Sequence, residues 1–157
     1  MTMTLEGLNE DFRDIVVLFA DSRVEFLIVG AYALAFHGAP RASGDIDLFV
    51  RPSIENAESV FAALEQFGAP VVSHGVTAAD FSRPGTVYQI GLPPRRIDIL
   101  TEISGVSFDE AWASRVEAEV EGRTLHVIGR EAFLRNKVAA GRPKDLADAA
   151  RLQKTKG

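Results

Sequence analysis

Three aspartates interrupt two otherwise apolar segments of this chain, and they constrain its fold more than any other feature. Asp45 and Asp47 lie two residues apart in the segment 45–50, and Asp98 lies inside the segment 95–100. Both segments are short, apolar and rich in branched side chains, which predicts strands. A charge in a buried strand costs free energy unless hydrogen bonds or opposite charges compensate it. The fold must therefore supply a partner for each carboxylate.

A divalent metal is the partner that this pattern favours. Residues i and i+2 of a strand point to the same face, so Asp45 and Asp47 project together. If the two strands are neighbours, about 5 Å apart, Asp98 joins them. Converging carboxylates raise one another's pKa unless a cation lies between them. Mg²⁺ (or Mn²⁺) fits such a site and brings phosphoryl chemistry with it, since it binds carboxylates, water and phosphate oxygens together.

The alternative interpretation is structural. The three aspartates could cap strand ends, or they could form ion pairs with Arg41, Arg95 or Arg96.

A glycine turn precedes the first aspartate pair. Gly30-Ala31 follows the apolar segment 25–29 and opens a predicted short helix over 31–36. Backbone N–H groups at such a turn can bind phosphate. Turns from strand to helix also use glycine for steric reasons alone, so the turn by itself is not specific.

The whole pattern predicts an α+β fold, in which helices pack against a small mixed β-sheet. The chain 1–157 is expected to form a single domain, with a core over about 24–128 and a C-terminal helical segment over about 130–154. The expected helices are 8–21, 31–36, one from Pro52-Ser53 to Gly68, 108–116, 130–139 and 143–153. The expected strands are 25–29, 45–50, the antiparallel pair 86–92 and 95–100, and 123–128, with a short strand beginning at Val71-Val72.

Composition narrows the possible chemistry and the compartment. The chain has no cysteine, so a disulfide framework, a thiolate nucleophile and a zinc–cysteine site are excluded. No segment approaches the roughly 18 apolar residues of a membrane span, and the first seven residues do not resemble a signal peptide. A cytoplasmic protein without membrane contact is expected.

Charge is divided unevenly along the chain. Residues 1–122 hold 8 arginines, no lysine and 19 acids, a net charge of −11, whereas residues 123–157 hold 9 basic residues and 3 acids, a net charge of +6. A basic segment on an acidic body favours a local anion site over a broad nucleic-acid surface. A solvated helical face is the alternative.

Together these motifs resemble the nucleotidyltransferase superfamily with the DNA polymerase beta-like fold. The resemblance rests on Gly30-Ala31, the Asp45-Ile46-Asp47 segment and Asp98, and it covers about residues 24–152. At the C-terminus, Lys137 and the segment from Arg142 to Asp148 look like the Lys and Arg-x-x-Asp motifs of one branch. That branch contains AbiEii-type and MenT-like toxins and small bacterial proteins of the DUF6036 type.

The resemblance implies roles for the acidic residues and for the C-terminal pair. Asp45 and Asp47 would bind metal, and Asp98 would complete the site and help to activate an attacking hydroxyl. Lys137 would neutralise a phosphate, and Asp145 would orient Lys137 or the nucleotide. The structural alternative is that Lys137 extends to water from the edge of an apolar stripe and that Asp145 interacts with a helix dipole.

The resemblance also implies nucleotide contacts near the glycine turn. Gly30 and Ala31 would hold the triphosphate, with Arg41 and Ser43 as helpers just before the aspartate pair. Ala31 departs from the family, which usually has Gly or Ser there, so a phosphate-binding hydroxyl is missing while the backbone N–H groups remain.

The expected function is a Mg²⁺-dependent nucleotidyltransferase that moves a nucleoside monophosphate from an NTP to an acceptor hydroxyl. The acceptor could be tRNA, a protein side chain or a small molecule, and a toxin would have an antitoxin protein as its partner. One alternative is a catalytically degenerate module that senses nucleotides or binds a protein. Another is an antibiotic-modifying enzyme, which predicts a deep acidic pocket for a cationic acceptor.

Overall fold

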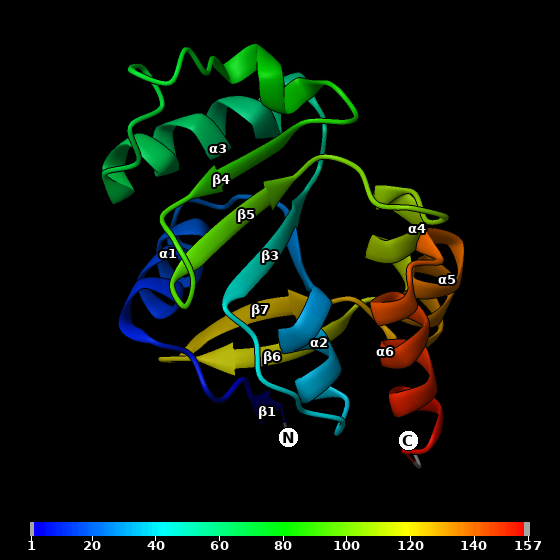
Figure 1. Ribbon diagram of the computed structural model, residues 1–157. Helices are drawn as coiled ribbons and strands as arrows, with labels where there is room; N and C mark the ends of the chain where they lie inside the picture. The colour runs from blue at the N-terminus through cyan, green and yellow to red at the C-terminus, as the bar shows by residue number, and fades with distance from the viewer. Residues whose placement is uncertain (1, 156–157) are drawn as a thin grey trace.

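The computed structural model describes residues 2–155 as one seven-stranded mixed sheet with helices around it (Figure 1). The strand order is β1-β6-β7-β2-β3-β5-β4. The strands are β1 (Met3–Thr4), β2 (Phe26–Val29), β3 (Asp45–Val50), β4 (Val87–Ile90), β5 (Arg96–Leu100), β6 (Val116–Val120) and β7 (Arg123–Val127). The helices are α1 (Glu10–Asp21), α2 (Gly30–Phe36), α3 (Ile54–Phe67), the 3-10 helix η1 (Ala78–Ser82), α4 (Phe108–Ala113), α5 (Arg130–Ala140) and α6 (Pro143–Gln153). The predicted α+β class is confirmed.

Strand β3 occupies the position in the sheet that the aspartate pattern requires. It pairs antiparallel with β2, where Val29 lies opposite Asp47, and parallel with β5, where Asp47 lies opposite Asp98. The expected neighbours are therefore adjacent and in register. Strands β4 and β5 form the predicted antiparallel pair.

The core forms where helix faces with regular apolar spacing meet the sheet. In α1 the buried positions are Phe12, Ile15, Val16 and Phe19, the three-to-four-residue spacing of an amphipathic helix. Phe19 meets Phe26 of β2 edge to face, with ring centroids 5.4 Å apart. Full burial of each such side chain contributes roughly 1.5–3 kcal/mol, and this packing fixes β2 and its neighbour β3.

Several elements differ from the sequence-based expectations. Strand β6 begins at Val116, where a helix was expected to end, because Val116, Ala118 and Val120 alternate with glutamates and pair with β7. Residues Val71-Val72 form a turn rather than a strand. Strand β1 and helix η1 were not expected. Strand β1 has only two residues and exists through its parallel pairing with β6, so no local pattern could indicate it.

Helices α5 and α6 pack against each other at one side of the sheet, beyond α2 (right in Figure 1). Pro143 begins α6, as proline at the first helical position favours. Within residues 2–155, no helix is long and apolar enough to cross a membrane.

Candidate active site

The three aspartates converge at one place in the sheet. Asp45 and Asp47 project from β3 and Asp98 projects from β5, and one carboxylate oxygen from each lies within 4.8 Å of the others. Asp98 is buried, whereas Asp45 and Asp47 are partly exposed. Three oxygen donors at this spacing, open on one side, suit a hard divalent cation that keeps positions for water or phosphate.

Arg96 contacts two of the three carboxylates. Its Nη2 donates to Asp45 Oδ2 at 2.8 Å and to Asp98 Oδ2 at 3.2 Å, and its Nε donates to Asp98 Oδ1 at 3.0 Å. Burial alone would raise the pKa of Asp45, but the hydrogen bonds from Ser43 and Arg96 outweigh it and lower the pKa. Of the three arginines considered as ion-pair partners of the aspartates, Arg96 therefore does form such pairs.

Asp47 has no such partner. No basic side chain of residues 2–155 lies within 4.0 Å of its carboxylate. Burial, followed by the charges of Asp45 and Asp98, raises the pKa of Asp47 to about 7. Burial also raises the pKa of Asp98, despite the opposing effect of Arg96. The basic side chains of residues 2–155 thus leave part of this negative charge uncompensated, and the donor set fits a divalent metal.

Gly30 makes room for Asp47. It has a φ of +68°, and a Cβ added to it would collide with the carboxylate of Asp47. The residue after it, Ala31, is buried in the first turn of α2. Glycine is required here both for its backbone conformation and for the close approach.

The loop before β3 carries the two predicted helpers. The Ser43 hydroxyl lies 2.9 Å from the backbone oxygen of Asp45 and 3.0 Å from its Oδ1. Arg41 instead turns toward α6, where Nε and Nη2 donate to the carboxylate of Asp148 at 2.7 and 2.9 Å. Arg95 pairs with Asp11 at 3.2 Å, so Arg96 is the only one of the three candidate arginines that contacts the triad.

The C-terminal pair lies inside a buried charge cluster. Lys137 is only 8% exposed, and its Nζ lies 3.5 Å from Asp145 Oδ1 and 3.6 Å from Asp148 Oδ2. The structural alternative, in which Lys137 extends to water, is therefore wrong. Arg142 donates to Asp145 at 2.6 Å. The positive charge of Lys137 lowers the pKa of Asp47, so the cluster acts electrostatically on the triad.

Sequence reasoning did not single out Asp148. It lies three residues after Asp145 on α6 and is almost completely buried. Residues three apart share a helix face, so the spacing of the two aspartates was the signal that could have indicated it.

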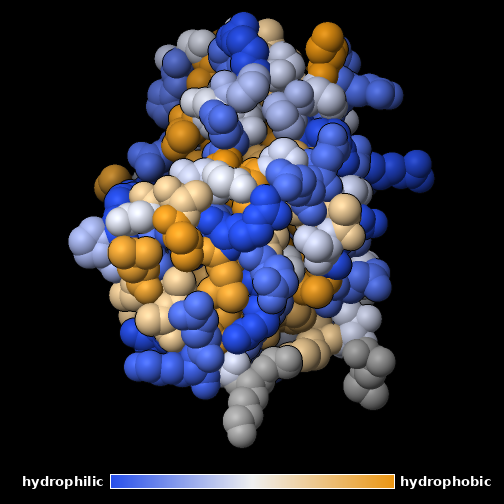
Figure 2. Space-filling model, turned by 90° about the vertical axis from the view of Figure 1, so that its right-hand side faces the viewer, coloured by the Kyte–Doolittle hydropathy of each residue, from blue (hydrophilic) through white to orange (hydrophobic). Residues whose placement is uncertain are grey.

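Ion pairs compensate part of the positive charge of the C-terminal segment. Several of its arginines are paired with acids, namely Arg123 with Asp21, Arg135 with Glu110 and Arg142 with Asp145. On the side of the molecule that carries α5 and α6, hydrophilic and hydrophobic side chains are interspersed over the surface (Figure 2).

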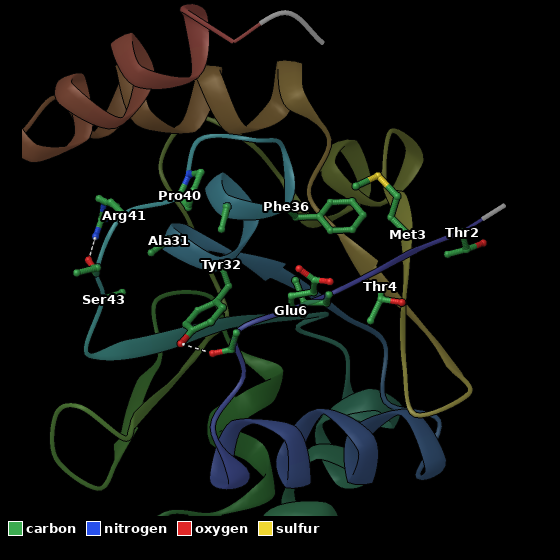
Figure 3. Close-up of a pocket in the computed structure, with 14 residues that line it drawn as sticks. Thr2, Met3, Thr4, Glu6, Ala31, Tyr32, Phe36, Pro40, Arg41 and Ser43 are labelled. Atoms are coloured by element: carbon green, nitrogen blue, oxygen red, sulfur yellow. Dashed lines mark hydrogen bonds between the residues drawn. The ribbon is translucent and has the colours of Figure 1, made fainter.

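A pocket of about 800 Å³ lies beside the loop before β3 (Figure 3). Residues 2–7 form one wall, and Tyr32 and Phe36 of α2 form another. The loop contributes Arg41 and Ser43, and the charged lining residues are Glu6 and Arg41 alone. With one acid and one base in its lining, this pocket is not itself the deep acidic pocket expected for a cationic acceptor.

No family model and no curated protein matches this sequence. Solved structures do match its fold. The lincosamide antibiotic adenylyltransferase LnuA, bound to lincomycin, is 16% identical with a TM-score of 0.56, over 96% of this chain and 100% of that one. The antibiotic-resistance factor ANT(2'')-Ia in solution is 15% identical with a TM-score of 0.61, over 94% of this chain and 83% of that one.

A crystal structure of ANT(2'')-Ia with adenylyl-2''-tobramycin is 17% identical with a TM-score of 0.56, over 91% of this chain and 86% of that one. Identities this low show a shared fold and nothing narrower. Membership of the branch of AbiEii-type, MenT-like and DUF6036-type proteins stays a prediction. This chain has the nucleotidyltransferase fold that these structures share.

Proposed function

We propose that this protein is a metal-dependent nucleotidyltransferase, which transfers a nucleoside monophosphate from an NTP to an acceptor hydroxyl. The observation that carries the proposal is the convergence of Asp45, Asp47 and Asp98 from two strands in register, with carboxylate oxygens within 4.8 Å of one another. The shared fold supports it. A degenerate binding module is disfavoured, because such a module has no need to keep three mutually repelling carboxylates together.

Asp45, Asp47 and Asp98 would hold Mg²⁺ or Mn²⁺. When bound, such an ion neutralises charge on phosphate oxygens and favours ionisation of a hydroxyl beside it. The acceptor oxygen would form a bond to the α-phosphorus as the bond to the bridging oxygen breaks, and pyrophosphate would leave. Asp98, which Arg96 holds in place on β5, would take the proton of the acceptor hydroxyl.

The basic groups near the triad would neutralise the polyphosphate. The positive charge of Lys137 acts on Asp47, where it opposes the rise in pKa. Arg41 lies four residues before Asp45. Gly30 and Ala31 would admit the phosphates close to the backbone, and Ser43 would fix Asp45 through its hydroxyl. Positioning and charge neutralisation would thus supply most of the catalysis.

Two classes of acceptor hydroxyl are proposed. The neighbouring structures contain lincomycin and adenylyl-2''-tobramycin, which supports a small-molecule acceptor. A tRNA or protein acceptor, with an antitoxin as the partner of a toxin, rests on the C-terminal motif of Lys137 and Asp145.

Thermal unfolding with each NTP, with and without Mg²⁺ or Mn²⁺, tests the proposal directly. A ligand that binds the native state raises its melting temperature by mass action. We expect a metal-dependent increase for at least one NTP, which is lost in the Asp45→Asn/Asp47→Asn double variant. No increase with any NTP and metal would refute the proposed donor. An NTP labelled at the α-phosphate then identifies the acceptor by transfer of the label.

A further inference from the structure

We propose that Asp148 is a positioning residue for nucleotide binding, which holds Arg41 where its guanidinium can bind the β- and γ-phosphates of a nucleoside triphosphate. The inference rests on the proposed function and deepens it. It assigns a role to a buried acid that belongs to neither the carboxylate triad nor the predicted nucleotide contacts.

The geometry places Asp148 between the two cations. Arg41 binds both carboxylate oxygens of Asp148, with Nε to Oδ1 at 2.7 Å and Nη2 to Oδ2 at 2.9 Å. Lys137 Nζ lies 3.6 Å from the same Oδ2. The Asp148 side chain is only 3% exposed. A single buried carboxylate on α6 therefore fixes one cation from the loop before β3 and one from α5.

The contact leaves Arg41 able to bind phosphate. A guanidinium has five N–H donors, and in Arg41 two of them face Asp148 while one from Nη1 reaches the backbone oxygen of Ala42. One N–H group on each of Nη1 and Nη2 has no protein partner within residues 2–155. The side chain is 28% exposed, so part of it is accessible to a ligand. Two parallel N–H groups match the oxygens of a phosphate.

Charge explains why Arg41 needs an anchor. Asp45 and Asp47 lie close enough to Arg41 for their charges to help raise its pKa, after the larger effect of Asp148. Without Asp148, the flexible Arg41 side chain could turn to the triad and neutralise the carboxylates that metal requires. Asp145 is already bound by Arg142 at 2.6 Å, so it offers Arg41 no equivalent partner.

The test compares dissociation constants of the full-length protein for an NTP and the matching NMP, both with Mg²⁺, in wild type, Asp148→Asn, Arg41→Gln and the double variant. We expect each single variant to weaken NTP binding about tenfold, the loss typical of a hydrogen bond to a charged group. The double variant should be no weaker than Arg41→Gln, because Asp148 acts through Arg41. Binding of the NMP, which has no β- or γ-phosphate, should change little.

Asp21→Asn is the matched control. Asp21 of α1, like Asp148, binds an arginine by two hydrogen bonds: Arg123 of β7 donates to its carboxylate at 3.0 and 3.1 Å. This pair lies away from the triad. A general loss of stability would affect this variant too and would weaken NTP and NMP alike. If Asp148→Asn does not fold, Asp148→Glu retains the charge that faces Lys137 but shifts the carboxylate by one methylene. It should still weaken NTP binding severalfold.

The outcomes are distinguishable. If the wild type binds an NTP with metal and the Asp148 variants bind it equally well, this inference is overturned and the proposed function stands. Additive losses in the double variant would also overturn it, since Asp148 would then act independently of Arg41. If the wild type binds no NTP with any metal, the proposed function fails and the role of Asp148 fails with it.

Discussion

Gly30 and Asp47 approach each other so closely that no side chain at residue 30 would fit between them. A Cβ on Gly30 would collide with Asp47 Oδ2, and the φ of +68° at this position already disfavours other residues. Gly30 and Asp47, with sixteen residues between them in the sequence, are therefore parts of one site.

Gly30→Ala should abolish metal-dependent NTP binding and also lower stability. The left-handed backbone conformation costs an alanine about 1–2 kcal/mol, and the collision with Asp47 adds to this cost. Gly75→Ala is the matched control, because Gly75 has a φ of +71° and nothing within 4 Å of an added Cβ. Thermal unfolding should show that both variants are destabilised. The increase in melting temperature on addition of Mg²⁺ and NTP should be lost only in Gly30→Ala. Equal NTP responses would separate Gly30 from the site.

Asp47→Asn should stabilise the metal-free protein at high pH. The carboxyl has an ordinary pKa of 3.8 and a folded-state pKa of about 7. Its proton is held more tightly in the folded state, so wild-type stability falls as pH rises from about 4 to 7 and then levels off. Asparagine does not titrate and escapes this loss.

We expect the advantage of Asp47→Asn to be on the order of 2 kcal/mol larger at pH 8 than at pH 5. Urea unfolding in EDTA at the two pH values measures it. An advantage that does not change with pH would contradict the raised pKa of Asp47. Asp47→Asn should also weaken NTP binding a hundredfold or more. Changing a residue that only supports a metal ligand already lowers metal affinity or activity by about 10–100-fold.

Lys137→Gln should weaken NTP binding and destabilise the fold. The change leaves Asp145 and Asp148 buried with one cation fewer, although Arg142 and Arg41 remain. We expect a loss of roughly 1–3 kcal/mol, the cost of an incompletely satisfied buried group. Lys144→Gln removes an exposed lysine from the first turn of α6 and should change neither quantity. Chemical denaturation and NTP titration of both variants provide the comparison. Similar effects of the two substitutions would show that burial of Lys137 is unimportant.

Asp145 should contribute stability that disappears in acid. Burial would raise the pKa of Asp145, but the hydrogen bond from Arg142 and the charges of Lys137 and Arg142 outweigh it and lower the pKa. The contribution is therefore complete above the unfolded-state pKa near 4 and is lost as pH falls through the lower folded-state value.

Asp145→Asn should accordingly cost on the order of 3 kcal/mol at pH 7, as breaking a buried ion pair does. The difference from wild type should shrink below about pH 4. Chemical denaturation of both proteins at a series of pH values measures this difference in the free energy of unfolding. A difference that stays constant down to pH 2 would contradict the lowered pKa.

Local patterns predicted the elements that position the site. The apolar faces of α1 and α3, the stop at Gly30 and the antiparallel pair β4 and β5 follow from residue spacing and turn residues. Strand β6 was missed because its short alternating pattern follows directly after a helix. Strand β1 was missed because two residues carry no periodicity.

The sequence by itself determined that Asp45 and Asp47 share a face and that a glycine precedes them, because strand alternation and backbone preference are local properties. Only the tertiary structure decided that β3 and β5 align Asp47 with Asp98. It also selected Arg96 from three candidate arginines to contact the triad and brought Asp148 to Arg41 across 107 residues. Such contacts depend on which distant side chains packing brings together, and spacing along the chain does not specify this.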